Sequence, residues 1–245
     1  MAMRILITND DGVFAEGIRL LAEWAKKLGE VTVVAPKREQ SGKSHAINFT
    51  EPMEIKRVDL MDGVEAYSCD STPADCVRYG IAGLKRTYDL VLSGINRGVN
   101  LGVDMIYSGT VAAIFEAAYW NHNALAFSTY PDASEDAAKE LDNIYNYIKE
   151  RKLFDYNPIY NVNIPKESRG IKITQQGSPY FDDEFNHIEG DLYLQTGKRI
   201  DDDFPLDLTR DTVAIENGYT TLTPVTLLRT NMEAFAKLSR AEALQ

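Results

Sequence analysis

Three polar turns in this sequence carry oxygen-bearing side chains that suit a metal ion. The first turn, residues 9–12, contains the adjacent carboxylates Asp10 and Asp11, and the other two turns hold Ser41 and Asn96. Adjacent carboxylates repel one another, and a bound cation relieves that repulsion. Carboxylate, hydroxyl and amide oxygens favour Mg²⁺, Mn²⁺ or Ca²⁺ over zinc. Each turn alone is also ordinary loop chemistry, so the prediction of a site depends on all three meeting in space.

A glycine-rich loop predicts a second feature, a phosphate site. Residues 94–104 lead to Ser108, Gly109 and Thr110 at the start of an Ala-rich helical segment. Helix N-termini bind phosphate through their free N–H groups, and two hydroxyls add donors there. A plain helix N-cap at Ser108 or Thr110 is the alternative. The motifs of a nucleotide-hydrolysing P-loop and of a dinucleotide-binding turn are both missing, so we expect neither ATP hydrolysis nor a dinucleotide cofactor.

The elements that must position these turns alternate between strand and helix. Apolar runs predict strands and 3.6-residue periodicity predicts helices. The predicted strands are 3–7, 31–35, 89–92 and 124–128, with extended stretches at 46–57 and 63–68, and the predicted helices are 17–28, 72–84, 110–120 and 134–151. This alternation predicts an α/β fold with a doubly wound, mostly parallel, Rossmann-like sheet. In such a sheet, turns at the carboxyl ends of neighbouring strands meet in one crevice.

The last third of the chain changes character. After predicted strands at 160–165 and 171–174, residues 177–211 are rich in Tyr, Phe, Asp and Gly and predict a β-hairpin extension. A return strand and a closing helix are predicted at 218–224 and 231–243. One domain overall is therefore divided into a catalytic core (1–175), an oligomerisation hairpin (176–211) and a return strand with the C-terminal helix (212–245). The aromatic residues of 180–204 are more typical of hairpin packing and subunit contacts than of base stacking.

Composition limits the classes of partner. A formal net charge of −11 disfavours a nucleic-acid polymer, because phosphate neutralisation needs clustered Lys and Arg. Two cysteines in 245 residues favour a reducing compartment over a disulfide scaffold. Without a leader-like segment or an apolar run of membrane-spanning length, a cytoplasmic protein with no membrane partner is expected. His45 follows Ser41 by four residues and is expected beside the metal ligands in the crevice.

These motifs resemble those of the survival protein SurE family of 5′-nucleotidases. The resemblance runs from residue 3 to about residue 225 and departs from the commonest pattern at Ile114, Phe115 and most of residues 176–210. The matching residues are Asn9 to Gly12, Ala35 and Pro36, Gln40 to Gly42 with Ser44, Thr72 to Val77, Ser93 to Asn100, Gly102 to Val111, Gly218 and Tyr219, and Thr223 and Pro224.

The resemblance implies a divalent-metal-dependent phosphatase that acts on nucleoside 5′-monophosphates. In this family 3′-monophosphates are often substrates too, and short polyphosphate is one in some members. Members form dimers or tetramers through the late hairpin and the C-terminal helix. It implies one cation per subunit, Mg²⁺ or Mn²⁺ with Ca²⁺ as a substitute in crystals, held by Asp10, Asp11, Ser41 and Asn96. The implied phosphate and substrate-binding residues are Asn9, Asn100, Ser108, Gly109 and Thr110.

The expected mechanism is metal-centred hydrolysis in which Asp10 or Asp11 orients or deprotonates the attacking water. One rival is an aspartyl nucleophile, as in haloacid-dehalogenase-like phosphatases. Those enzymes place two aspartates two positions apart, whereas here the acids are adjacent and position 9 is Asn. A second rival is a non-catalytic, stress-related scaffold that binds metal or nucleotide. The sequence leaves open the base preference, the phosphate position and the physiological metal.

Overall fold

A twisted sheet forms the centre of the computed structural model, which describes residues 2–200 and 206–242. Its strand order is β3-β4-β2-β1-β5-β6-β7-β11-β8. Strands β4, β2, β1, β5, β6 and β7 pair in parallel, while β3 and β11 pair antiparallel to β4 and β7. The strands are β1 (Met3–Thr8), β2 (Gly29–Pro36), β3 (Ile55–Val58), β4 (Glu65–Cys69), β5 (Leu90–Arg97), β6 (Ala124–Thr129), β7 (Ile159–Ile164), β8 (Ile171–Ile173) and β11 (Thr220–Pro224).

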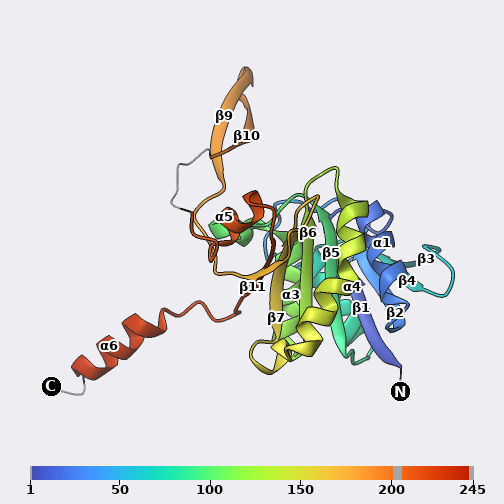
Figure 1. Ribbon diagram of the computed structural model, residues 1–245. Coiled ribbons are helices and arrows are strands. Elements are labelled where there is room, and N and C mark those ends of the chain that lie inside the picture. Colours follow the sequence, from blue (N-terminus) through green and yellow to red (C-terminus); the bar gives the residue numbers. More distant parts are fainter. Residues whose placement is uncertain (1, 201–205, 243–245) are drawn as a thin grey trace.

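Helices cover both faces of this sheet (Figure 1). Helices α1 (Glu16–Ala25) and α4 (Ser134–Glu150) pack together on one face, and α2 (Pro73–Arg78) and α3 (Gly109–Tyr119) pack together on the other. Thr72 caps α2 by accepting a hydrogen bond from the Asp75 N–H, and Pro73 occupies the first turn. The predicted doubly wound, mostly parallel α/β fold is therefore confirmed.

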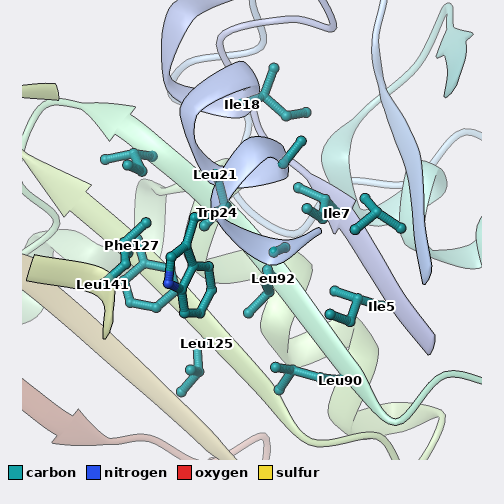
Figure 2. Packing of buried hydrophobic residues seen from close by; sticks show 14 of the residues in the cluster. Ile5, Ile7, Ile18, Leu21, Trp24, Leu90, Leu92, Leu125, Phe127 and Leu141 are labelled. Atoms are coloured by element: carbon teal, nitrogen blue, oxygen red, sulfur yellow. The ribbon is translucent and has the colours of Figure 1, made fainter. Parts of the chain in front are cut away.

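The hydrophobic core is split between the two faces because successive strand residues point in opposite directions. In β1, Ile5 and Ile7 face α1 and α4, while Leu6 faces α2 and α3. Figure 2 shows the first of these layers, in which Trp24 of α1 packs edge-on against Phe127 of β6. Strands buried on both faces explain the nearly unbroken Ile, Leu and Val runs of the sequence.

Several elements differ from their predicted bounds. Strand β5 continues to Arg97, so Asn96 lies at the end of a strand rather than in the predicted loop. A 3₁₀ helix, Gly102–Tyr107, occupies part of that loop. The predicted helix 72–84 is an α-helix that continues as a π-helix, Tyr79–Gly83, and of the predicted extended stretch 46–57 only the end enters β3. Two short elements were not predicted, the 3₁₀ helix Leu153–Asp155 and the helix α5 (Asp211–Glu216).

Two segments project from the body of the molecule (Figure 1). Strands β9 (Phe181–Glu189) and β10 (Leu192–Arg199) form the predicted hairpin as a separate sheet. Helix α6 (Met232–Glu242) lies beyond β11 and exposes Met232, Phe235 and Leu238. Residues 201–205 of the predicted extension and 243–245 of the C-terminal helix segment lie outside the described residues. Within residues 2–200 and 206–242, no helix has both the length and the apolar character needed to cross a bilayer.

Candidate functional site

The candidate site lies where β2, β1 and β5 end side by side. The turn after β1 carries Asp10 and Asp11, the loop after β2 carries Ser41, and the end of β5 carries Asn96. The first two turns are joined directly, because the Gln40 N–H donates to the Asp10 carbonyl at 2.7 Å and the Val13 N–H donates to the Pro36 carbonyl at 2.8 Å. The sheet therefore brings the predicted turns to one edge, as ligand sites of open α/β sheets require.

Asp10 is the most deeply buried carboxylate of this edge, with 3% of its surface exposed. Burial raises its pKa to about 6, hydrogen bonding by the Thr110 hydroxyl opposes the rise, and the charge of Asp11 adds to it. Thr110, which is fully buried at the start of α3, donates to Asp10 Oδ1. No described cationic side chain forms an ion pair with Asp10. A buried carboxylate without a cationic partner is poorly stabilised in its charged form.

Asp11 and Ser41 lie on the more open side of the site. Burial raises the pKa of Asp11; the Arg97 N–H, 3.4 Å from Asp11 Oδ2, opposes the rise and nearby Glu39 adds to it. Ser41 is exposed, and its hydroxyl donates to Glu39 at 2.7 Å. Glu39, which the sequence did not single out, thus contributes a third negative charge beside the two aspartates.

The amides of this edge are oriented by their neighbours. Asn96 donates its side-chain N–H to the Gly98 carbonyl at 2.7 Å, which turns its amide oxygen away from that bond and makes it available as an acceptor. Asn100 donates its side chain to Ser128 at 2.7 Å, and its backbone carbonyl accepts from Asn161 and Asn163. The loop that carries Asn100, directly after β5, is therefore fixed against β6 and β7.

Asn9 has a different position from the other predicted substrate-binding residues. Its side chain is fully buried, donates to the Gly12 carbonyl at 2.9 Å and accepts from the Gly12 N–H at 3.2 Å. Both ends of the amide therefore shape the acidic turn. A substrate contact at Asn9 stays a prediction, whereas its role in holding the conformation of the turn is visible.

The start of α3 packs directly against the acidic turn. Ser108 caps the helix by accepting from the Val111 N–H at 3.1 Å, so the N-cap alternative for Ser108 holds, and Ser108 also lines the cavity beside Asp10. Gly109 is constrained by space, since a Cβ there would lie 3.1 Å from Asp10 Oδ2 and from the Pro73 ring. The absence of a side chain at residue 109 lets the carboxylate approach the positive end of the helix.

His45 is expected beside the metal ligands, but the structure places it on Glu116 of α3. Its Nε2 lies 2.9 Å from Glu116 Oε2, while Glu116 Oε1 accepts from Arg78 at 3.0 Å and from Trp120 at 2.9 Å. Burial opposes ionisation of Glu116, but hydrogen bonds from His45 and Trp120 and the charge of Arg78 outweigh it and lower its pKa. His45 thereby ties the loop that carries Ser41 to α3.

Replacing Glu116 with Gln is expected to loosen this tie. Loss of charge-assisted hydrogen bonds should lower the free energy of unfolding by about 2 kcal/mol. If Ser41 binds a cation, the looser loop should also raise the half-saturating Mg²⁺ concentration by roughly tenfold. Urea unfolding and Mg²⁺ titration of activity measure the two effects. Asp136→Asn, which removes an exposed partner of Lys139, is the matched control and should change neither quantity. Equal behaviour of the two variants would contradict the prediction.

The donor set fits a hard divalent cation. No group of three or more His, Cys, Asp or Glu side chains arranged for a metal occurs in the described part of the chain. A site here would therefore combine the two carboxylates with the hydroxyl of Ser41 and the amide oxygen of Asn96. Mg²⁺, Mn²⁺ and Ca²⁺ accept such oxygen ligands. The buried, uncompensated charge of Asp10 is the observation that favours a cation.

A cavity of about 260 Å³ adjoins this cluster, and its lining includes residues that sequence reasoning missed. Asp10, Asn100 and Ser108 line one part of it, and Phe181 and Asp183 of the hairpin line another. The sequence predicted the hairpin but associated its aromatic residues with packing and subunit contacts. No local pattern indicates which strand residue reaches a cavity formed by a loop 80 residues earlier.

The chain matches a known protein family over most of its length. The sequence profile described as "Survival protein SurE" matches residues 5–183. The chain belongs to the survival protein SurE family. Among relatives, a "5'-nucleotidase SurE" of Thermosipho melanesiensis is 38% identical over 96% of each chain. Another from Thermoanaerobacter sp. (strain X514) is 40% identical over 91% of this chain and 92% of its own.

A solved structure of another SurE protein has the same fold as this chain. The SurE protein from Aquifex aeolicus superposes with a TM-score of 0.81 at 33% identity, covering 98% of this chain and 99% of that chain. The likeness thus includes the hairpin and the C-terminal segment as well as the central sheet. Membership of the SurE family, expected from the motifs, is confirmed.

Proposed function

We propose that this chain is a divalent-metal-dependent 5′-nucleotidase that hydrolyses nucleoside 5′-monophosphates to nucleoside and phosphate. The observation that carries the proposal is the buried carboxylate of Asp10, which has no cationic partner among the described residues and lies against the N-terminus of α3. The names of the SurE relatives, 38–40% identical to this chain, support the same activity. Nucleoside 3′-monophosphates and short polyphosphate are proposed as further substrates.

Four residues are proposed to hold one Mg²⁺ or Mn²⁺ ion per subunit: Asp10, Asp11, Ser41 and Asn96. When bound, the cation supplies electrophilic polarisation of the phosphoryl group and a more acidic bound water. Asp11, the less buried of the two carboxylates, is then placed to orient or deprotonate the attacking water, while Thr110 holds Asp10 in one rotamer.

The start of α3 is proposed to bind the phosphoryl oxygens. Ser108 lines the cavity beside Asp10, and the helix N-terminus presents N–H groups that lack intrahelical acceptors. Donors fixed before substrate arrives stabilise the charge that develops on transferring phosphoryl oxygens. The contributions of Gly109 and Thr110 are mainly spatial, since Gly109 leaves room for the carboxylate of Asp10 and Thr110 donates a hydrogen bond to it.

The simplest test is phosphate release from AMP and GMP. Activity is expected with Mg²⁺ or Mn²⁺, abolished by EDTA and restored by excess cation, because the carboxylates cannot stabilise the phosphoryl charge alone. Released phosphate is measured colorimetrically across a panel of nucleoside monophosphates and cations. A scaffold would instead show metal-dependent thermal stabilisation without turnover. An aspartyl nucleophile would be revealed by a fluoride mimic of phosphate trapped on one carboxylate.

A dimer or tetramer in the cytoplasm is also proposed. The hairpin exposes Phe185, Ile188 and Leu194, and α6 exposes Met232, Phe235 and Leu238. Monomeric proteins rarely expose large groups of apolar side chains, so these surfaces favour subunit contacts. Both cysteines are free and buried, which suits a reducing compartment. Light scattering of the purified chain gives the oligomeric state.

A further inference from the structure

The cavity beside Asp10 has two chemically different parts. Asp10, Asn100 and Ser108 contribute the part proposed to bind the phosphoryl group. Phe181 and Tyr107, with 43% and 58% of their surfaces exposed, contribute aromatic rings to the remaining wall. At about 260 Å³ the cavity is near the lower end of the size of small-molecule sites. It therefore has room for more of a substrate than its phosphate.

Phe181 is held at this wall by the root of the hairpin. Asp104, from the 3₁₀ helix that precedes Ser108, accepts the N–H of Tyr180 at 2.7 Å and that of Phe181 at 2.9 Å. Tyr180 is buried with Leu101 and Ile215. The loop beside the proposed phosphate site and the first residues of β9 are thus joined, so the hairpin root is part of the site.

Strand geometry keeps the Phe181 ring uncovered on the cavity side. Phe181 and Asp183 point to the same face of β9, because side chains alternate along a strand. Gly197 of β10 pairs with Asp183 and also lines the cavity. A Cβ at Gly197 would lie 3.6 Å from the Cβ of Phe181 and 3.7 Å from its ring. A larger residue at 197 would occupy the space over the ring, which glycine leaves open.

We propose that Phe181 is a specificity-determining residue, whose ring together with Tyr107 receives the aromatic base of the nucleotide. The side chain of Asp183 has no hydrogen-bonding partner among the described residues, and its carboxylate accepts hydrogen bonds from the amino or hydroxyl groups of the nucleoside. This inference rests on the proposed nucleotidase function. Base stacking on an aromatic side chain is sequence-tolerant and equivalent to roughly tenfold in affinity. The site would thus select for a base without strong preference among bases.

The test compares AMP with ribose 5-phosphate, which has the same ester and sugar but no base. Phe181→Ala is expected to lower the ratio of kcat/KM for AMP to kcat/KM for ribose 5-phosphate by roughly tenfold, mainly through KM for AMP. Phe181→Tyr is expected to restore the ratio, since it keeps an aromatic face. Tyr156→Ala is the matched control: Tyr156 is an aromatic residue with 83% of its surface exposed, and it neither lines the cavity nor lies in the hairpin or α6.

Gly197→Leu provides a second, independent variant. A Cβ at Gly197 would meet its nearest atoms at ordinary van der Waals distance, so the hairpin is expected to fold, which thermal unfolding checks. The added side chain should lower the same ratio by filling the space over Phe181. If both esters are hydrolysed but neither variant changes the ratio, this inference is wrong and the proposed function stands. If the wild-type protein hydrolyses neither ester with Mg²⁺ or Mn²⁺, the proposed function itself fails and the inference with it.

Discussion

Replacement of Asp10 with Asn is expected to lower kcat/KM for AMP in Mg²⁺ by about 100-fold or more. Replacing a residue that hydrogen-bonds to a metal ligand typically lowers metal affinity or activity 10–100-fold. Replacing the ligand itself should cost at least as much. The hydroxyl of Thr110 can still donate to the amide oxygen of Asn, so the local geometry should survive. Steady-state phosphate release over a range of Mg²⁺ concentrations measures the loss. Turnover at the wild-type level with saturating Mg²⁺ would refute the metal-centred mechanism.

The same variant is expected to be more stable than the wild-type protein when metal is absent. The native-state pKa of Asp10 is about 6, above the ordinary 3.8, so between these pH values the native state binds more protons than the unfolded state. The free energy of unfolding of the metal-free wild type should therefore fall as the pH rises from 4 to 6, and it should remain at the lower value at higher pH. Asn carries no charge, so the variant escapes this penalty, which amounts to as much as about 3 kcal/mol.

Thermal unfolding after EDTA treatment and dialysis, at pH 5 and pH 8, separates this effect from catalysis. The unfolding temperature of Asp10→Asn should exceed that of the wild type by more at pH 8 than at pH 5. Asp136→Asn, at an exposed carboxylate of α4, should show little difference between the two pH values. A variant that loses both activity and metal-free stability at pH 8 would mean that Asp10 acts through folding.

Gly17→Ala is expected to destabilise the protein by about 3 kcal/mol or more, although alanine is the better helix former. Gly17 lies in the first turn of α1, where a Cβ would be only 2.0 Å from the carbonyl oxygen of Ile95 in β5. Backbone cannot rotate away as a side chain can, so α1 must move off the sheet. The shift would also disturb Asn96, the neighbour of Ile95, and should lower activity.

Urea unfolding of Gly17→Ala measures the effect, with Arg19→Ala on the exposed side of the same helix as the control. Helix propensity alone predicts that Gly17→Ala stabilises by about 1 kcal/mol. The two arguments therefore predict opposite signs. A stabilised Gly17→Ala protein would show that the contact between α1 and β5 is looser than described.

Most of the fold could be predicted because its strands are buried on both faces. Unbroken apolar runs such as Ile5 to Ile7 and Leu90 to Leu92 predict strands of a parallel sheet that helices cover on both faces. Errors occurred where a local signal was weak or misleading. The pair Ser93 and Gly94 reads as a turn, yet β5 continues through it to Arg97. Helix α5 is six residues long and has no side-chain cap, so neither periodicity nor capping indicated it.

The candidate site was predictable to the extent that strand order decides it. Once β2, β1 and β5 are neighbours, the turns that carry Asp10, Ser41 and Asn96 must share an edge. The position of Phe181 in the wall of the cavity beside Asp10 was not predictable in this way. Its position depends on two backbone N–H groups reaching Asp104, 76 and 77 residues earlier, and no sequence period records such a contact. The tie between His45 and Glu116 is equally long-range.

The central position of β1 affects how the chain can fold as it is synthesised. This first strand is bordered by β2 and by β5, with Ile5 paired to Leu90. Its second neighbour therefore does not exist until about residue 97 has been made, and parallel pairings over such separations are slow to form. The acidic turn at the end of β1 must wait for the same event. Strand β1 is thus completed on both edges only after β5 has been made, and its open edge must avoid other chains meanwhile.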